Sequence, residues 1–302
     1  MTRPCKVGVQ LPEVERFVAW PEFQDLARRA EAVGYDSIWV GDHLLYDLPD
    51  GSTRGPYEAW TSLAAIAAAT ERVELGPLVA STSFHAPAML AKQAATVDAI
   101  SQGRLIVGLG AGWNRREFDA FGFPYDRRVS RFAEALAIIA PLLREGRSTF
   151  RGHFYEVDDC VLDPRPVRAG GPPIMVGSNS PRMLEIALPV VDAWNVWWSV
   201  YGNSAERFAE VKAEVDSAMP ESRSLEATAA VLVTLPGGRG RLMGETYDAE
   251  VTTVRPDDLA EHVRGLADAG ATHLQLVLDP ITAESIDTVG EVLADLDESS
   301  GP

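Results

Sequence analysis

The sequence predicts a (β/α)8 barrel, an α/β fold of alternating parallel strands and helices, with insertions in the loops at the carboxyl-terminal face. Apolar, β-branched runs bounded by turn residues recur along the chain, and a segment with helical spacing follows each of them. Eight such units close into a barrel more naturally than they spread into an open sheet. A chain of 302 residues has the size of one barrel, so we expect a single domain over residues 1–302.

The first four units occupy the amino-terminal half of the chain. Turn residues mark their helices: Gly34 ends the first, Pro87 begins the third and Gly103 closes it. The loop after the second strand is polar and long enough to form a lid. We expect strands at residues 6–11, 37–40, 73–79 and 105–108, and helices at 21–33, 60–70, from 87 to the closing glycine, and 128–144.

The last four units follow a segment without helical period. Residues 149–171 combine aromatic, acidic and proline residues, so we expect an insertion with short strands that covers the barrel mouth. The remaining expected strands are 174–176, 193–196, 227–235 and 273–278, and the helices are 182–188, 205–219 and 256–269. We expect the tail at 295–302 to be frayed.

Composition and charge exclude several classes of protein. A formal net charge of -17 repels phosphate backbones and anionic lipid surfaces, so we expect neither nucleic acid nor a membrane as a partner. Cys5 and Cys160 lack C-x-x-C spacing and the histidines share no ligand spacing, so no metal is expected. The amino terminus lacks the apolar core of a signal peptide, and no apolar run reaches about 18 residues. We therefore expect a cytoplasmic protein.

Residues at the carboxyl ends of the strands are the candidates for chemistry, because barrel enzymes build their sites from the loops there. Asp42 and His43 follow the second strand. An imidazole that changes its protonation near neutral pH suits proton transfer to or from a substrate alcohol or ring nitrogen. The alternative is that this aspartate and histidine are merely hydrated polar residues of a surface loop.

The loop Gly177-Ser-Asn-Ser-Pro-Arg182 presents backbone N–H groups before a helix, where phosphate binds favourably. A capping turn with Ser180 as N-cap explains the same residues, and the two interpretations are compatible. Three indoles lie around a later strand end, where they either line an apolar substrate pocket or pack between the barrel and its helices: Trp194, Trp197 and Trp198.

The fourth strand runs into the glycines 108, 110 and 112, which open its end to a flat cofactor. The spacing is close to a dinucleotide fingerprint. However, the third glycine of G-x-G-x-x-G would fall on Trp113, so the Rossmann interpretation fails on spacing.

These segments together resemble the luciferase-like monooxygenase superfamily. The resemblance rests on Val40-Gly-Asp-His43, on Ile106-Val-Gly-Leu-Gly-Ala-Gly-Trp-Asn114 and on the loop at 177–179, and it covers nearly the whole chain. It implies that Asp42 contacts the reactive ring of the cofactor and that His43 is the general acid or base. It also implies contacts from Leu78, Val79, Ala111, Gly112 and Trp113 to the ring, and from Gly177, Ser178, Asn179 and the neighbouring Arg182 to the phosphate.

Two further details follow from the resemblance. The superfamily has a non-proline cis peptide in the bulge that ends the third strand, and Leu78-Val79 corresponds to it. Several relatives carry a glutamate where this chain has Trp113, and that glutamate serves a sugar-phosphate dehydrogenase subgroup. Trp113 therefore argues against a sugar-phosphate substrate.

Two cofactors serve this superfamily: FMN, which is reduced externally and reacts with oxygen, and coenzyme F420, a deazaflavin that exchanges hydride. The chain lacks the long insertions of many FMN monooxygenases, and its motifs are most similar to the F420-dependent branch. We therefore expect an oxidoreductase that transfers a hydride between F420 and a small organic substrate. The alternatives are an FMN-dependent monooxygenase that uses reduced flavin and O2, and a non-catalytic flavin-binding protein.

The resemblance also implies partners. We expect a homodimer packed through early barrel helices, since the alanine-rich segment 59–70 allows close approach, and a flavin or F420 reductase that supplies the cofactor. The loop after His43 and residues 149–171 are expected to set substrate specificity. Neither carries a recognisable motif, so the sequence leaves the substrate open.

Overall fold

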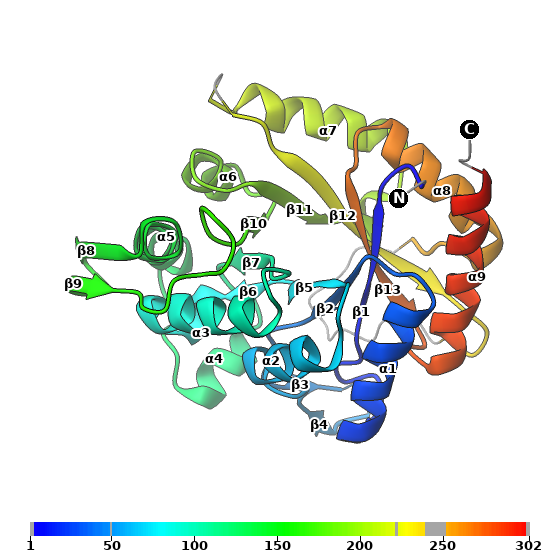
Figure 1. Ribbon diagram of the computed structural model, residues 1–302, viewed down its shortest axis with the longest axis horizontal. Helices are drawn as coiled ribbons and strands as arrows, with labels where there is room; N and C mark the ends of the chain where they lie inside the picture. The colour runs from blue at the N-terminus through cyan, green and yellow to red at the C-terminus, as the bar shows by residue number, and fades with distance from the viewer. Residues whose placement is uncertain (1–2, 49, 221–222, 239–251, 300–302) are drawn as a thin grey trace.

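Parallel strands close into a barrel around which the helices are arranged (Figure 1). The computed structural model describes residues 3–48, 50–220, 223–238 and 252–299. The strands follow one another in the order β5 (Glu74–Pro77), β2 (Ser37–Val40), β1 (Lys6–Gln10), β13 (His273–Asp279), β12 (Glu226–Thr234), β11 (Ala193–Trp197), β10 (Ile174–Gly177), β7 (Val107–Gly110) and β6 (Ala80–Ser81). All neighbouring pairs in this order are parallel, so the predicted barrel class is confirmed.

The third strand of the barrel consists of two pieces. β5 pairs with β2, whereas β6 pairs with β7, and the residues between them, Leu78 and Val79, are joined by a cis peptide. Leu75 of β5 bridges Leu105, which closes the ring of strands just before β7 begins at Val107. The cis peptide expected at Leu78-Val79 is confirmed. The interruption lies at the carboxyl end of the strand, where the loops of the site begin.

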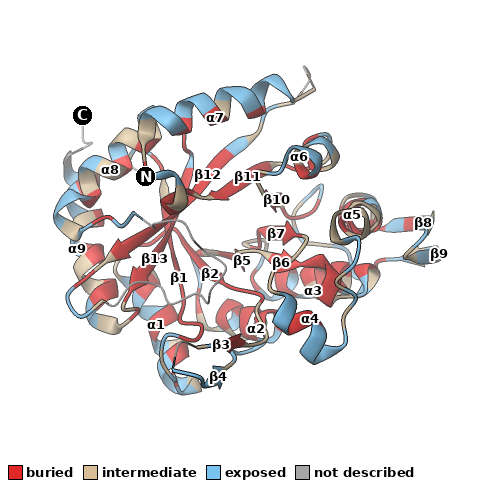
Figure 2. Cartoon of the chain, turned by 180° about the vertical axis from the view of Figure 1, so that it is seen from behind, coloured by how far each residue is buried: buried red, intermediate tan, exposed pale blue. Residues whose placement is uncertain are grey.

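Helices cover the outer face of the barrel. Their apolar faces pack on the strands, and their outward faces are exposed (Figure 2). The helices are α1 (Trp20–Ala32), α2 (Ala59–Ala69), α3 (Pro87–Ile100), α4 (Arg115–Phe121), α5 (Arg128–Glu145), α6 (Pro181–Ala187), α7 (Ala205–Ser217), α8 (Pro256–Asp268) and α9 (Ala283–Ser299), with short 3-10 turns η1 (Thr82–Phe84) and η2 (Trp198–Tyr201). No helix in the described part of the chain combines the length and apolar character that a membrane crossing requires.

The expected insertion forms an antiparallel hairpin of β8 (Arg147–Arg151) and β9 (Glu156–Val161), so the prediction of short strands is confirmed. The expectation that it covers the barrel mouth is wrong, because the hairpin lies outside α5 (Figure 1). The reason is Glu134 of α5, whose carboxylate accepts backbone N–H groups from the hairpin turn at 2.7, 2.8 and 3.0 Å, from residues 153, 154 and 155.

The carboxyl-terminal tail is helical up to Ser299, so the expectation of fraying from residue 295 is wrong for the described residues; residues 300–302 lie outside them. Leu293 and Leu296 are fully buried because α9 packs on α1 and α8. Asp297 accepts two hydrogen bonds from Arg3 at 3.1 and 2.7 Å, which joins the two ends of the chain.

The long loop after β2 carries a small antiparallel ribbon of β3 (Tyr46–Asp47) and β4 (Thr53–Arg54). Arg54 donates to the carbonyl oxygen of Val14 at 2.6 Å, and the hydroxyl of Tyr57 donates to that of Val18 at 3.1 Å. These bonds hold the β2–α2 loop against the loop that follows β1.

Candidate active site

A cavity of about 640 Å³ opens at the carboxyl ends of the parallel strands. Of the sequence-predicted site residues, all but one line it: Asp42, His43, Leu78, Val79, Ala111, Gly112, Trp113, Gly177, Ser178 and Asn179. Arg182 is the exception. It is exposed on α6, and its guanidinium donates to the hydroxyl of Ser130 at 3.3 Å. No lining residue comes from 149–171, so the expectation that this segment shapes the pocket is wrong.

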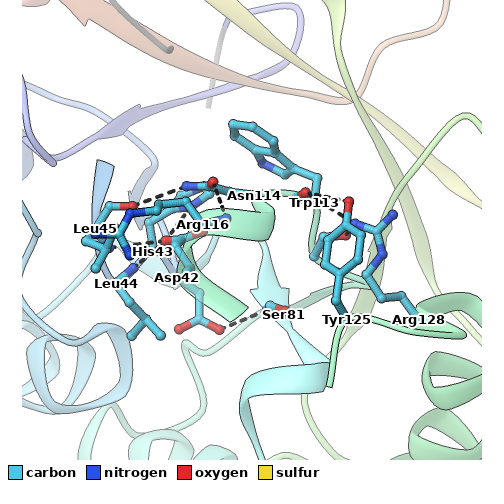
Figure 3. Close-up of polar contacts among 12 residues, drawn as sticks. Asp42, His43, Leu44, Leu45, Ser81, Trp113, Asn114, Arg116, Tyr125 and Arg128 are labelled. Carbon is cyan, nitrogen blue, oxygen red and sulfur yellow. Dashed lines mark hydrogen bonds and ion pairs between the residues drawn. The ribbon is translucent and has the colours of Figure 1, made fainter. Parts of the chain in front are cut away.

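Asp42 is buried at the cavity wall, and one of its carboxylate oxygens accepts two hydrogen bonds from the protein. Oδ2 accepts the backbone N–H of Ser81 at 2.8 Å (Figure 3) and the Nε2–H of His85 at 2.8 Å. The position of the Asp42 carboxylate is therefore set by β6 and by His85, which directly follows η1.

His43 is held by a buried carboxylate. Its Nδ1 lies 3.1 Å from both carboxylate oxygens of Glu117, whose side chain is 1% exposed. Glu117 also accepts the backbone N–H groups of Leu44 at 2.6 Å and Leu45 at 3.3 Å. A carboxylate at Nδ1 keeps the proton of a neutral imidazole on that nitrogen, so Nε2, at the other edge of the ring, is the proton acceptor. This arrangement suits a general base.

Glu117, which lies in the first turn of α4, is not among the sequence-predicted site residues. Its neighbours also contact the β2–α2 loop. The side chain of Asn114 donates to the carbonyl oxygen of Leu45 at 3.2 Å (Figure 3), and Arg116 pairs with Asp47 at 3.0 Å. The only signal for this contact in the sequence is one acidic residue soon after the glycine-rich strand end. The loop that carries His43 is thus attached to α4 at several points.

Aromatic rings surround His43. Its ring centroid lies 4.7 Å from that of Tyr46 and 5.7 Å from that of Trp113. The backbone of Trp113 is fixed in turn, since its carbonyl oxygen accepts from the hydroxyl of Tyr125 at 3.3 Å and from Arg128 at 3.2 Å (Figure 3).

The three tryptophans near β11 divide between the two roles considered from the sequence. Trp197 lines the cavity. Trp194 and Trp198 are fully buried and pack against Phe208 of α7, at ring centroid distances of 5.9 and 5.1 Å.

Two glycines shape the wall opposite the cis peptide. A Cβ atom at Gly110 or at Gly177 would lie 2.8 Å from Cγ2 of Val79, which real Cβ contacts do not reach. Only glycine allows the Val79 side chain to lie between these two strand ends. At these two positions the cavity wall carries no side chain of its own, and the Val79 side chain packs against the backbone there.

Some polar groups of the loop after β10 already form hydrogen bonds within the protein. The N–H of Ser178 donates to the carbonyl oxygen of Asn195 at 3.2 Å, and that of Ser180 donates to the Ser178 hydroxyl at 3.1 Å. The side-chain amide of Asn179 donates to the hydroxyl of Tyr201 at 2.8 Å. Ser180 is the N-cap of α6, as the capping interpretation predicts, although its side chain makes no capping bond.

A parallel barrel with a cavity and a carboxylate-paired histidine at its carboxyl-terminal face has the architecture of an α/β-barrel enzyme. In the described residues, no three histidine, cysteine, aspartate or glutamate side chains gather as metal ligands would. The chain belongs to the luciferase-like monooxygenase family, whose model matches residues 6–236. It is an oxidoreductase, as are the relatives it matches.

Curated relatives carry both kinds of flavin-like cofactor in their names. The F420-dependent glucose-6-phosphate dehydrogenase of Intrasporangium calvum is 30% identical over 293 residues, which cover 84% of this chain and 87% of the relative. The FMNH2-dependent dimethylsulfone monooxygenase of Pseudomonas putida is 29% identical over 214 residues, which cover 69% of this chain and 56% of the relative.

A solved structure confirms the fold. The F420-dependent secondary alcohol dehydrogenase in complex with an F420-acetone adduct superposes with a TM-score of 0.76 at 20% identity. The match covers 97% of this chain and 99% of that chain.

Proposed function

We propose that this oxidoreductase transfers a hydride between coenzyme F420 and a small organic substrate. The observation that carries the proposal is the pair of His43 and Glu117 at the cavity wall. Oxidation of an alcohol to a carbonyl releases a proton, and a base beside the substrate must accept it. The choice of F420 is supported by the relative matched over 87% of its length, which is named as F420-dependent.

The cavity wall fits a flat ring system. Positions 110 and 177 carry no side chain, and the Val79 side chain packs between them. We assign ring contacts to Asp42 and to the residues on either side of this wall, Leu78, Val79, Ala111, Gly112 and Trp113. When bound, the deazaflavin supplies the carbon that accepts or donates the hydride.

Gly177, Ser178 and Asn179 are the proposed phosphate contacts. The Ser178 hydroxyl already accepts a bond from Ser180, and it still has its own proton to donate. The backbone N–H of Asn179 and the second N–H of its side-chain amide add further donors. Arg182 would have to leave Ser130 to contribute, so its role is secondary.

His43 handles the proton in this proposal. Nε2 takes the proton of the substrate hydroxyl during oxidation and returns it during reduction, and Glu117 stabilises the imidazolium that forms. Glu117 also fixes the ring position, which matters because proton and hydride acceptors must both lie near their target atoms.

Parallel titrations with F420 and FMN, followed by fluorescence and calorimetry, test the proposal. Tight F420 binding with weak FMN binding is the expected result. His43→Ala should keep cofactor affinity and lose turnover; a comparable loss of both would contradict the assigned role.

The second candidate is an FMN-dependent monooxygenase that takes reduced flavin from a reductase. The likeness to the Pseudomonas putida enzyme favours it. Oxygen consumption with reduced FMN, together with tight FMN binding, would establish this activity in place of the first. A non-catalytic flavin-binding protein is the weakest alternative, because nothing in such a role uses the pairing of His43 with Glu117.

For the assembly, we propose a homodimer in the cytoplasm, supplied by a flavin or F420 reductase. Alanine-rich α2 and its neighbour α3, on which Met89 is 57% exposed, form the proposed dimer face. Sedimentation of the parent protein and of the Met89→Glu variant tests this dimer face. The mass of a monomer for both proteins would contradict the proposed homodimer.

A further inference from the structure

We propose that the substrate is an uncharged alcohol or ketone with an apolar body, and that Trp113 selects it. This inference rests on the proposed function and names the substrate class for the same cavity. Three sets of observations lead to it: the rings around His43, the charges that line the cavity, and the partners of the nearby arginines.

The surroundings of His43 are aromatic. Tyr46 is buried against one side of the imidazole, and the indole of Trp113 stands edge-on to it at an interplanar angle of 70°. Trp113 lines the cavity, whereas Tyr46 does not. A substrate whose hydroxyl meets His43 therefore has the Trp113 indole as a neighbour, and that contact favours an alkyl or aryl group over a hydrated one.

The charges at this end of the cavity are acidic. Glu13, Asp42 and Glu117 line it, and no lysine or arginine does so within the described residues. Asp42 and Glu117 are almost completely buried, so water screens them poorly. A phosphate dianion near His43 would be repelled by these carboxylates, and binding an anion there would require a compensating cation.

Two arginines close to Trp113 in the sequence, Arg116 and Arg128, are engaged elsewhere. Arg116 pairs with Asp47 at 3.0 Å on the exposed side of α4. Arg128 donates to the carbonyl oxygens of Gly112 and Trp113, and its guanidinium lies 3.9 Å from the ring centroid of Tyr125. Moving either arginine to a substrate phosphate would break these contacts.

Apolar side chains also line the rest of the cavity, which the cofactor shares: Leu78, Val79, Phe84, Met183, Val196, Trp197 and Val200. The described lining thus offers hydrogen-bonding groups for a hydroxyl or carbonyl and apolar surface for its substituents. It offers no counter-ion for a negative charge.

The redox step balances for such a substrate. The carbinol C–H bond breaks and its hydride, with both electrons, passes to the oxidised cofactor. The O–H bond breaks and its proton passes to Nε2 of His43, while the carbon–oxygen double bond forms. The alcohol is oxidised to a ketone and the cofactor is reduced by two electrons.

The test compares 1-phenylethanol and acetophenone with glucose and glucose 6-phosphate. Calorimetric titration of the cofactor-loaded protein measures binding, and F420 absorbance measures turnover. We expect acetophenone and 1-phenylethanol to bind at least about 100-fold more tightly than glucose 6-phosphate. Binding of the phosphorylated sugar as tight as that of the apolar alcohol would overturn the inference.

Variants at Trp113 test the selecting residue. Trp113→Ala should raise KM for 1-phenylethanol about tenfold with a smaller change in F420 affinity, and Trp113→Phe should restore most of the loss. Phe121→Ala, which removes a half-exposed ring at the far end of α4, is the matched control and should leave KM unchanged. An unchanged KM in Trp113→Ala would overturn the assignment.

The two proposals can fail separately. Selective binding of 1-phenylethanol and acetophenone, with neither reduction of F420 by the alcohol nor oxidation of reduced F420 by the ketone, would support the substrate class and reject hydride transfer. Reduction of F420 by glucose 6-phosphate would support hydride transfer and reject the substrate class.

Discussion

Replacement of Glu117 by glutamine tests how the site prepares His43. Glutamine has nearly the same shape, and its carbonyl oxygen can keep the bonds from the N–H groups of Leu44 and Leu45, now at 2.6 and 3.3 Å. Its NH2 group then takes the place of Oε2, 3.1 Å from Nδ1 of His43, and stabilises the tautomer in which Nδ1 accepts, while the negative charge that stabilises an imidazolium is lost. In that tautomer the proton of the neutral ring is on Nε2, so the ring cannot take a proton from the substrate there.

We expect kcat to fall by about 100- to 10,000-fold, the usual contribution of a positioned general base, with little change in cofactor affinity. The free energy of unfolding should fall by about 1–2 kcal/mol, because the bonds at Glu117 lose their charge assistance. Glu117→Ala should cost about 3–5 kcal/mol, since it leaves the N–H groups of Leu44 and Leu45 without their acceptor.

Single-turnover absorbance of F420 measures the hydride step, and urea titration measures stability. The double variant His43→Ala/Glu117→Gln isolates the coupling. If Glu117 acts through His43, the double variant is no slower than His43→Ala alone. A wild-type kcat in Glu117→Gln, or multiplied losses in the double variant, would refute the reasoning.

Gly177→Ala should weaken cofactor binding and cost about 1–3 kcal/mol in urea titration, because its Cβ would lie 2.8 Å from Val79; Gly265→Ala, with 3.6 Å to its nearest neighbour, is the control and should not lose stability. Burial, and to a lesser degree Lys6, lowers the pKa of His273 from 6.5 to about 3, so between these values only the unfolded chain binds the proton. Stability should therefore fall as the pH drops from 6.5, and a pH series of urea titrations should show that His273→Gln reduces this slope by up to about 1.4 kcal/mol per pH unit; an equal slope would contradict it. Arg104→Lys should cost about 2–4 kcal/mol by calorimetry, because lysine cannot replace the five bonds donated to residues 67, 70, 73 and 101; an unchanged melting temperature would contradict this.

The barrel could be predicted because its elements are set by local patterns. Prolines begin α3, α6 and α8, and glycines end several helices, so most helix bounds agree with the expectation to within about two residues. The errors concern docking between distant segments. Composition identified the hairpin of β8 and β9 as an insertion, but its position depends on Glu134 of α5, whose contact with the turn no local pattern reveals.

The error at the carboxyl-terminal end of the chain also comes from contacts between distant segments. Polar residues after 295 suggest fraying, yet Leu296 is buried and Asp297 reaches Arg3, 294 positions earlier. Strand β7 starts at Val107 because Leu105 makes only an isolated bridge to Leu75, a detail of barrel closure that hydrophobicity alone does not show.

The candidate site also contains some residues that the sequence could place and others that it could not. Asp42, His43 and the residues at 111–113 and 177–179 follow strands, and parallel strands bring their carboxyl ends to one face of the barrel, so the sequence could place them together. His85 and Glu117 act through contacts 43 and 74 positions away in the chain. Neither residue lies in a sequence motif from which its partner could be predicted.

Glu117 is also obscured by a pattern with another meaning. An Asn114-x-x-Glu117 sequence at a helix start is typical of a capping box, in which the glutamate reaches back to the N-cap N–H. Asn114 does cap α4, accepting the N–H of Arg116 at 3.2 Å, but the Glu117 carboxylate bonds to the β2–α2 loop instead. Because one carboxylate holds both His43 and the backbone of the next two residues, that loop cannot move away from α4 without releasing the imidazole. The position of the proposed base is therefore controlled by the first turn of α4 as much as by the strand that precedes it.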